Sequence, residues 1–371
     1  MAVVEVGRTV RAGYIGDTRC TRHFSSLWLP DAPDKTTFSS MLTEAEEARG
    51  AGAERLWTLE TESDANVNHL ERIVSGGLQC STEDCLVLVV PEVWHEQFDV
   101  MRRLVSAVLE SGFISALYCL RPSVAWTLGS GRCSAVMMDV GYNHATTTAV
   151  LDGYALRNTV VSSGVAGAAV TRHLRSMIEA EQLQSLDCVS RFKVRSVQEL
   201  VIDDVVDCIK QAACVVRSEK AGAESQSEPL MLRAPDGSSI TVEARAKTEP
   251  YELLFRRSSS SSTDLSLAHA LAGCARSLDP EWRCQSVPHL LCGGTTRATG
   301  FQQRLLTEAQ HEDSYYFRYE KEGTFQVSSN TDGCWIGASL VADSAAFSSL
   351  WVTRAEMEEE GYSALHRKLF Y

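Results

Sequence analysis

The sequence contains no pair of cysteines at the Cys-x-x-Cys spacing of many zinc sites. Its 12 cysteines are scattered, and the nearest pairs are Cys80 with Cys85 and Cys208 with Cys214. Structural zinc sites usually draw on tighter pairs of Cys or His. Scattered cysteines in a large chain are typical of buried free thiols, which persist in a reducing compartment. We therefore expect an intracellular protein without a zinc site.

Long apolar runs and runs of basic residues are also missing. No apolar run approaches the roughly 20 residues that cross a bilayer, and Met1–Val6 has neither the basic residues nor the apolar core of a signal peptide. The formal net charge, 35 − 48 = −13, disfavours non-specific binding to nucleic acid or to an anionic membrane. Backbone amides can still bind phosphate in an acidic protein. We expect no direct contact with nucleic acid or membrane.

One α/β motif occurs twice in the chain. The apolar run Val3–Val6 leads through a glycine into a second run that ends near Asp17, and Ala135–Val140 leads through a glycine into Thr146–Leu151. Both copies predict a strand, a turn and a second strand. The acid and the glycine are Glu5 with Gly7 in the first copy and Asp139 with Gly141 in the second. Such a repeat is what a duplicated α/β architecture leaves, and its two acids would face each other across a cleft.

Periodicity and turn residues predict further elements. These are a buried strand at Leu86–Val90, helices at Phe98–Leu109, Val201–Val216, Leu265–Leu278 and Phe301–Ala309, a short exposed helix at Thr43–Arg55, a turn at Pro235–Gly237, an exposed loop at Ser258–Ser262, and a capping box of Thr353 with Glu356 before a helix that stops at Gly361.

Taken in order, these motifs resemble the actin family, and the resemblance covers nearly the whole chain except residues 18–65. It implies an α/β actin-like fold of two duplicated lobes and four subdomains, with a nucleotide cleft between the lobes. The small lobe would comprise residues 1–138 and 329–371, with 25–65 as a divergent second subdomain. The large lobe would comprise 139–328, with about 173–262 as the fourth subdomain. The matching segments are Ala12–Asp17, Met137–Gly141, Asp152–Leu156, Gly167, Cys208–Cys214, Leu232–Gly237, Thr248–Phe255, Gly293–Thr296, Gly300 and Trp335–Phe370.

The resemblance implies ATP or ADP with Mg²⁺ as the ligand of this cleft, with a nucleotide-free protein as the alternative. Glu5 and Asp139 would hold the metal through waters. The residues expected to contact the nucleotide are Gly7, Arg11, Asp139, Gly141, Lys210, Gly293, Gly294 and Thr295.

The chain departs from the family pattern where phosphate chemistry would occur. Pro122 stands at the position of a water-orienting glutamine, Thr146 at that of a histidine, and Tyr142 replaces a carboxylate. Losing such groups typically removes several kcal/mol of barrier lowering, so we expect no catalytic residues and a pseudo-ATPase. As alternatives, His144, two residues out of register, would substitute for the histidine. Either Arg8 or Arg11 would itself occupy the phosphate site, or both would be solvated surface residues.

The C-terminal match suggests a groove for an amphipathic partner helix, alongside plain core packing for each single residue. Its candidate lining residues are Gly141, Ala338, Leu340, Phe347 and Leu350.

We therefore expect a divergent actin-related protein that acts as a non-catalytic, scaffolding subunit of a cytoskeletal or motor-associated complex, dynactin-like or of axonemal dynein. Its partners would be proteins, including actin or other actin-related subunits, in the cytoplasm, cytoskeleton, cilium or flagellum. One alternative is an ATP-binding protein that polymerises or switches with slow hydrolysis. Another is a nuclear subunit of a chromatin-remodelling complex. A sugar or glycerol kinase is disfavoured by the actin-type C-terminal segment.

Overall fold

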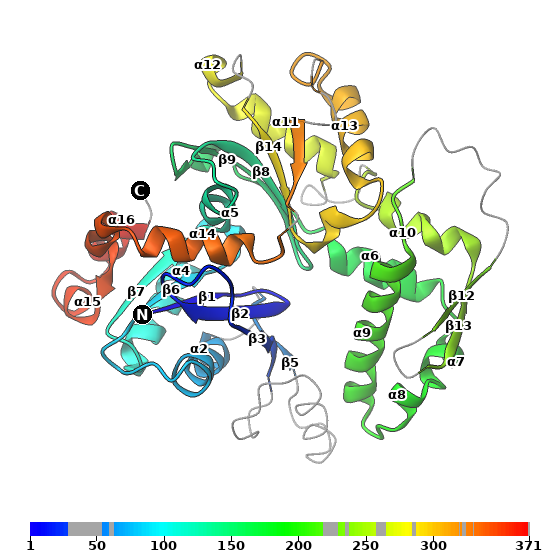
Figure 1. The fold of residues 1–371 in the computed structure, drawn as a ribbon, viewed down its shortest axis with the longest axis horizontal. Helices are drawn as coiled ribbons and strands as arrows, with labels where there is room; N and C mark the ends of the chain where they lie inside the picture. The colour runs from blue at the N-terminus through cyan, green and yellow to red at the C-terminus, as the bar shows by residue number, and fades with distance from the viewer. Residues whose placement is uncertain are drawn as a thin grey trace.

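The computed structural model of the chain describes residues 1–28, 54–58, 63–217, 229–233, 237–256, 265–283, 287–318, 320, 324–328 and 330–369, and it contains two large β-sheets with helices packed around them (Figure 1). The first sheet has the strand order β16-β7-β6-β1-β2-β3, and the second has the order β10-β9-β8-β14-β15, with β11 also paired to β9. The strands of the first sheet are β1 (Ala2–Glu5), β2 (Thr9–Tyr14), β3 (Arg22–Ser25), β6 (Cys85–Val89), β7 (Ala116–Leu120) and β16 (Val352–Thr353). Those of the second are β8 (Ala135–Val140), β9 (Ala145–Leu151), β10 (Tyr154–Ala155), β11 (Val161–Ser163), β14 (His289–Cys292) and β15 (Phe325–Val327).

The two sheets are built alike. In each, an antiparallel hairpin comes first in the chain, β1 with β2 and β8 with β9. Strands β6 and β7 then continue the first sheet in parallel with β1, as β14 and β15 continue the second in parallel with β8. The repeated motif is therefore confirmed as the start of each half of a duplicated α/β fold. The division of the chain into four subdomains at the stated boundaries stays a prediction.

Helices cover both sheets. They are α2 (Ser63–Glu71), α3 (Glu92–His95), α4 (Phe98–Ser111), α5 (Pro122–Gly129), α6 (Gly167–Ser176), α7 (Ala180–Gln184), α8 (Asp187–Ser190), α9 (Arg195–Ala213), α10 (Glu249–Glu252), α11 (Leu267–Ser277), α12 (Pro280–Arg283), α13 (Phe301–Glu312), α14 (Gly333–Ala342), α15 (Arg354–Glu360) and α16 (Tyr362–Leu369). Two further strand pairs are β4 (Leu27–Trp28) with β5 (Glu54–Arg55) and β12 (Leu230–Arg233) with β13 (Ser239–Val242). Across the described part of the chain, none of these helices is both long and apolar enough to cross a membrane.

Most predicted elements are confirmed, and two need correction. The helix predicted over Thr43–Arg55 is wrong at its end, because Glu54–Arg55 pairs as a strand with β4; residues 43–53 lie outside the described residues. Helix α9 begins and ends earlier than predicted. After Ala213 the backbone amides of Val215 and Val216 donate to Lys247 and Thr299, so tertiary hydrogen bonds replace the last helical turn. The loop at Ser258–Ser262 and residues 234–236 also lie outside the described residues.

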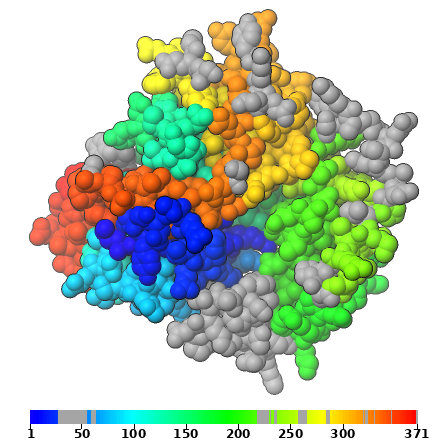
Figure 2. Space-filling view, in the orientation of Figure 1, coloured from blue at the N-terminus to red at the C-terminus, as the bar shows by residue number. Residues whose placement is uncertain are grey.

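A buried layer joins the two sheets. It contains Val3 from the first sheet, Met137 from the second, and Trp335 from α14, all essentially without exposed surface. The indole Nε1 of Trp335 donates to the carbonyl oxygen of Val3 over 3.0 Å, which satisfies the buried donor. Figure 2 shows the orange surface of α14 directly against the blue surface of residues 1–28.

Helices α5 and α14 lie between the two sheets and touch backbone to backbone (Figure 1). A Cβ atom added to Gly337 would lie 1.8 Å from the carbonyl oxygen of Ala125, and one added to Gly129 would lie 2.0 Å from that of Gly333. Real side chains cannot approach so closely, so glycine is required at both positions of this contact.

Candidate functional site

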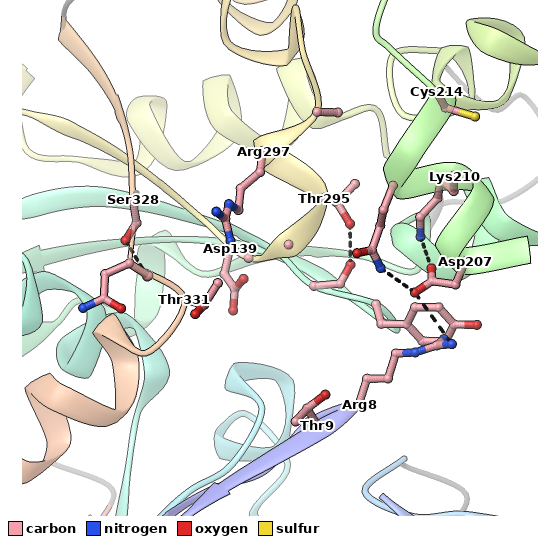
Figure 3. Close-up of a pocket in the computed structure, with 18 of the residues that line it drawn as sticks. Arg8, Thr9, Asp139, Asp207, Lys210, Cys214, Thr295, Arg297, Ser328 and Thr331 are labelled. Carbon is pink, nitrogen blue, oxygen red and sulfur yellow. Dashed lines mark hydrogen bonds and ion pairs between the residues drawn. The ribbon is translucent and has the colours of Figure 1, made fainter. Parts of the chain in front are cut away.

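A cavity of about 650 Å³ lies between the two hairpins, α9 and the loop after β14 (Figure 3). Every residue that the sequence analysis proposed as a metal or nucleotide contact lines it. These residues are Glu5, Gly7, Arg11, Asp139, Gly141, Lys210, Gly293, Gly294 and Thr295. Strands of both sheets end at this cavity, and that is where ligands of open α/β sheets usually bind. Their contact with a bound ligand stays a prediction.

The loop after β14 packs tightly on the second hairpin. In the register of the parallel strands, Cys292 lies beside Asp139, so Gly293 meets the carboxyl group of Asp139 directly. Gly293 has a φ of 86°, and a Cβ there would lie 2.4 Å from Asp139 Oδ1. Thr295 Oγ1 donates to the carbonyl oxygen of Gly141 over 3.0 Å. Packing therefore explains Gly293 and Thr295 of the Gly-Gly-Thr-Thr sequence without a ligand, whereas a Cβ at Gly294 would meet nothing within 4 Å.

The two acids of the hairpins share a poorly solvated environment. Burial, together with the negative charges of Glu5 and Glu92, raises the pKa of Asp139 to about 7 against the opposing charge of Arg11. Burial also raises the pKa of Glu5, although Arg11 opposes the shift. An acid that keeps its proton near neutral pH is a poor ligand for a cation. The described residues contain no group of three or more His, Cys, Asp or Glu side chains that could hold a metal ion. A Mg²⁺ ion held through waters needs only one or two carboxylates, so the metal role of Glu5 and Asp139 stays a prediction.

Arg11 and Lys210, the cations expected to meet phosphate, are already paired. The guanidinium of Arg11 donates to Glu5 Oε1 and to Asp332 Oδ1, each over 3.1 Å. The ammonium of Lys210 lies 2.5 Å from Asp207 Oδ1 and donates to Thr171 Oγ1 over 2.9 Å. Burial lowers the pKa of Lys210, against the opposing charge of Asp207.

Arg8 spans the cavity between the two hairpins and α9. Its guanidinium carbon lies 3.8 Å from the centre of the Tyr142 ring, and its Nη2 lies 2.5 Å from Asp204 Oδ1 and 3.7 Å from Asp207 Oδ2. Figure 3 shows Arg8 reaching toward Asp207 across the cavity. The alternative of a solvated surface arginine is therefore wrong, since only 18% of the Arg8 side chain is exposed.

The carboxylates that receive Arg8 were missed by the sequence analysis. Asp204 and Asp207 stand three residues apart on α9, which places them on one face of the helix. That spacing was visible in the sequence as an acidic helix face. Its arginine partner, 196 residues earlier, was not.

Pro122 and Thr146 stand at the two positions where the actin-like pattern has water-orienting residues. Pro122 begins α5, and Thr146 is buried opposite Asp139 in the β8–β9 register. Both line a smaller cavity of about 110 Å³, together with His144 and Asp139. The imidazole of His144 is half-buried, and burial lowers its pKa. His144 is thus the polar side chain that the out-of-register alternative requires.

Residues 1–370 match the family model described as Actin. The chain belongs to the actin family. It is also 26% identical over 303 residues to Actin-like protein 9 of Rattus norvegicus, in an alignment that covers 80% of this chain and 69% of that protein. The predicted actin-like fold and family are thereby confirmed.

The groove predicted within this actin-family fold needs correction. Ala338 and Phe347 are 0% and 2% exposed in the layer between the sheets, and Gly141 lines the cavity described above. Leu340 is 59% exposed and Leu350 is half-buried. The five residues therefore do not form one groove, because Ala338 and Phe347 are core residues. For these two, the alternative of plain core packing is confirmed.

Proposed function

We propose that this member of the actin family is a non-catalytic, structural subunit of a multiprotein cytoskeletal or motor-associated complex, dynactin-like or of axonemal dynein. In this proposal the fold is retained for its surfaces and its interlobe packing, and the cleft hydrolyses no ATP. The protein acts in the cytoplasm or cytoskeleton, including a cilium or flagellum. Its partners are proteins, among them actin or other actin-related subunits.

The pairing of the cavity's cations carries this proposal. Three of the four basic residues that line the cavity are held by carboxylates of the chain itself, and the fourth is Arg297. A polyphosphate would have to break these pairs before the three cations could bind it. The three cations are Arg8, Arg11 and Lys210, and the carboxylates are Glu5, Asp204, Asp207 and Asp332.

The loss of water-orienting groups supports the same proposal. Proline offers no side-chain polar group at position 122, and Thr146 is a buried residue of the second hairpin itself. General-base positioning of water typically contributes about 10²–10⁴-fold to a hydrolytic rate. A cleft without it would bind a nucleotide, if at all, as a static ligand.

Apolar surface on α14 supports the proposal of protein partners. Leu340 exposes 59% of its surface, although the chain around it is packed into the core. An amphipathic partner helix would cover this side chain.

The nucleotide content of the native protein tests the proposal. Nucleotide is extracted from protein purified without added ATP and identified by chromatography, and phosphate release is followed after addition of MgATP, with a hydrolysing actin as positive control. We expect no nucleotide, or ATP that has not been hydrolysed. Stoichiometric ADP together with phosphate release would refute a non-catalytic role.

The position of His144 favours one second candidate, an ATP-dependent switch with slow hydrolysis. It lines the smaller cavity together with Asp139, and an imidazole there would orient a water. This candidate requires measurable turnover that His144→Ala abolishes and that an exposed histidine variant, His23→Ala on β3, leaves unchanged. Absence of turnover in the unmutated protein would eliminate it.

A further inference from the structure

Arg8 and Arg55 connect one side of the cleft to a single carboxylate on the other side. Arg8 follows β1 and Arg55 lies in β5, whereas Asp204 lies on α9. The Nη2 atoms of the two arginines lie 2.5 Å and 2.6 Å from the same atom, Asp204 Oδ1. The three side chains are 18–26% exposed, so water screens these contacts less than those of ordinary surface pairs.

Stacking adds a second connection at the same place. The guanidinium carbon of Arg8 lies over the Tyr142 ring, 3.8 Å from the ring centre. Tyr142 follows the second hairpin's glycine, so Arg8 touches the opposite hairpin as well as α9. A planar guanidinium can stack on a ring while its edge pairs with a carboxylate.

These contacts lie away from the place where the two sheets are packed together. Figure 1 shows the β1–β2 hairpin pointing toward α9, while α5 and α14 lie between the sheets on the other side. The glycine contacts of α5 with α14 hold the chain backbones together there. A rigid-body opening would pivot at such a packed contact and would separate Arg8 from Asp204.

We propose that Arg8, Arg55, Asp204 and Tyr142 form a latch that holds the two sides of the cleft closed without a ligand. The latch is also an autoinhibitory contact, because a polyphosphate can enter between the hairpins only if Arg8 leaves both Tyr142 and Asp204. This inference deepens the proposed function, since it identifies what keeps the cleft closed in a protein that does not cycle nucleotide.

The thiol of Cys214 reports whether the cleft is closed. Cys214 lines the large cavity, is 7% exposed, and donates to the carbonyl oxygen of Ala246. Its rate of alkylation is measured by peptide mass spectrometry in nucleotide-free protein. Cys133, which is exposed, and Cys274, which is buried in another part of the core, serve as internal references. All proteins carry Cys208→Ser, because that exposed thiol lies on α9 beside Asp204.

Asp204→Asn is the test, and Asp203→Asn is its matched control. Asp203 is the neighbouring residue on α9, but it pairs over 2.8 Å with Arg175 of α6, on its own side of the cleft. We expect Cys214 to be alkylated about tenfold or more faster in Asp204→Asn, and within about twofold of the parent in Asp203→Asn, because only the former pair restrains opening. The rate at Cys274 should not change in either variant.

A parental rate in a folded Asp204→Asn protein would overturn the latch, and so would an equal increase in Asp203→Asn. Arg8→Gln gives an independent measurement that leaves α9 unaltered, and it should accelerate Cys214 in the same direction. The result is separable from the proposed function. Hydrolysis of ATP by a protein with a working latch would refute the non-catalytic role alone, and a missing latch in a protein without turnover would refute only this inference.

Discussion

His289 illustrates how much one buried side chain can couple stability to pH. It begins β14, is 1% exposed, and stacks on Phe325 with ring centres 4.8 Å apart and planes 11° from parallel. Within the described residues, neither ring nitrogen has a hydrogen-bond partner. Burial lowers its pKa to about 4, from 6.5 in an exposed histidine. The folded chain therefore keeps this imidazole neutral where the unfolded chain would protonate it.

This coupling predicts a loss of stability in acid. The unfolded state binds the proton more readily, so the stability contributed by His289 is present above pH 6.5 and is lost as the pH falls toward 4. We compare the free energy of unfolding of His289→Phe with that of the parent at each pH. This difference should be about 2 kcal/mol more favourable to the variant at pH 5 than at pH 8. Denaturant titrations at both pH values measure this. The exposed His23 on β3 is the control, and an equal effect of His289→Phe at the two pH values would contradict the argument.

At the scale of elements, α5 and α14 pack with their backbones in direct contact. Glycines of each helix lie so close to the backbone of the other that a Cβ atom would overlap it. Gly333 adds a further restriction, since a Cβ there would lie 2.4 Å from the ring of Trp126. Three glycine positions on two helices are therefore fixed by packing.

A methyl group at this contact should be costly. Gly337→Ala would place its Cβ against the carbonyl of Ala125, and overpacking of this kind costs about 3 kcal/mol. Gly76→Ala is the matched control, because a Cβ there meets nothing within 4 Å, and its effect should stay within about 0.5 kcal/mol. Denaturation midpoints of the two variants give the comparison. Parental stability of Gly337→Ala would show that the helices separate readily.

Local patterns predicted the elements whose signals are local. The capping box of Thr353 with Glu356 is present as predicted, and Gly112 ends α4 in the left-handed conformation. The end of α9 was wrong because amides of Val215 and Val216 bond to residues far along the chain. No pattern within the sequence reports on such partners.

At the scale of the molecule, the same limit applies to the candidate site. The resemblance to the actin family predicted which residues gather at the cavity, and all of them do. It did not predict the pairs of Arg8 with Asp204 and of Arg11 with Asp332, because these pairs join segments 196 and 321 residues apart. The pair of Lys210 with Asp207 is local to α9, and its spacing was visible in the sequence. Whether Arg8 and Arg11 bind a ligand or their own chain is decided by how these distant segments pack.

A cleft that does not respond to nucleotide should not drive assembly of filaments. We expect the purified protein to stay in the supernatant after high-speed centrifugation in MgCl₂, KCl and ATP, under conditions that sediment an actin control. The physical reason is that ligand exchange cannot shift an equilibrium between two states that bind the ligand equally poorly. A pellet that appears above a critical concentration would contradict this expectation.

The hydrogen bond from Trp335 to Val3 has a consequence for biosynthesis. Trp335 is translated 332 residues after Val3, the residue to which its indole donates. At ordinary rates of translation this interval is roughly 20–60 seconds. Strand β16, which pairs with β7, emerges later still. During that interval the face of the first sheet that packs on Trp335 lacks α14, and incompletely covered apolar surface of this kind is prone to aggregate. A ribosome-bound intermediate of this protein should therefore depend on chaperones until α14 has been synthesised.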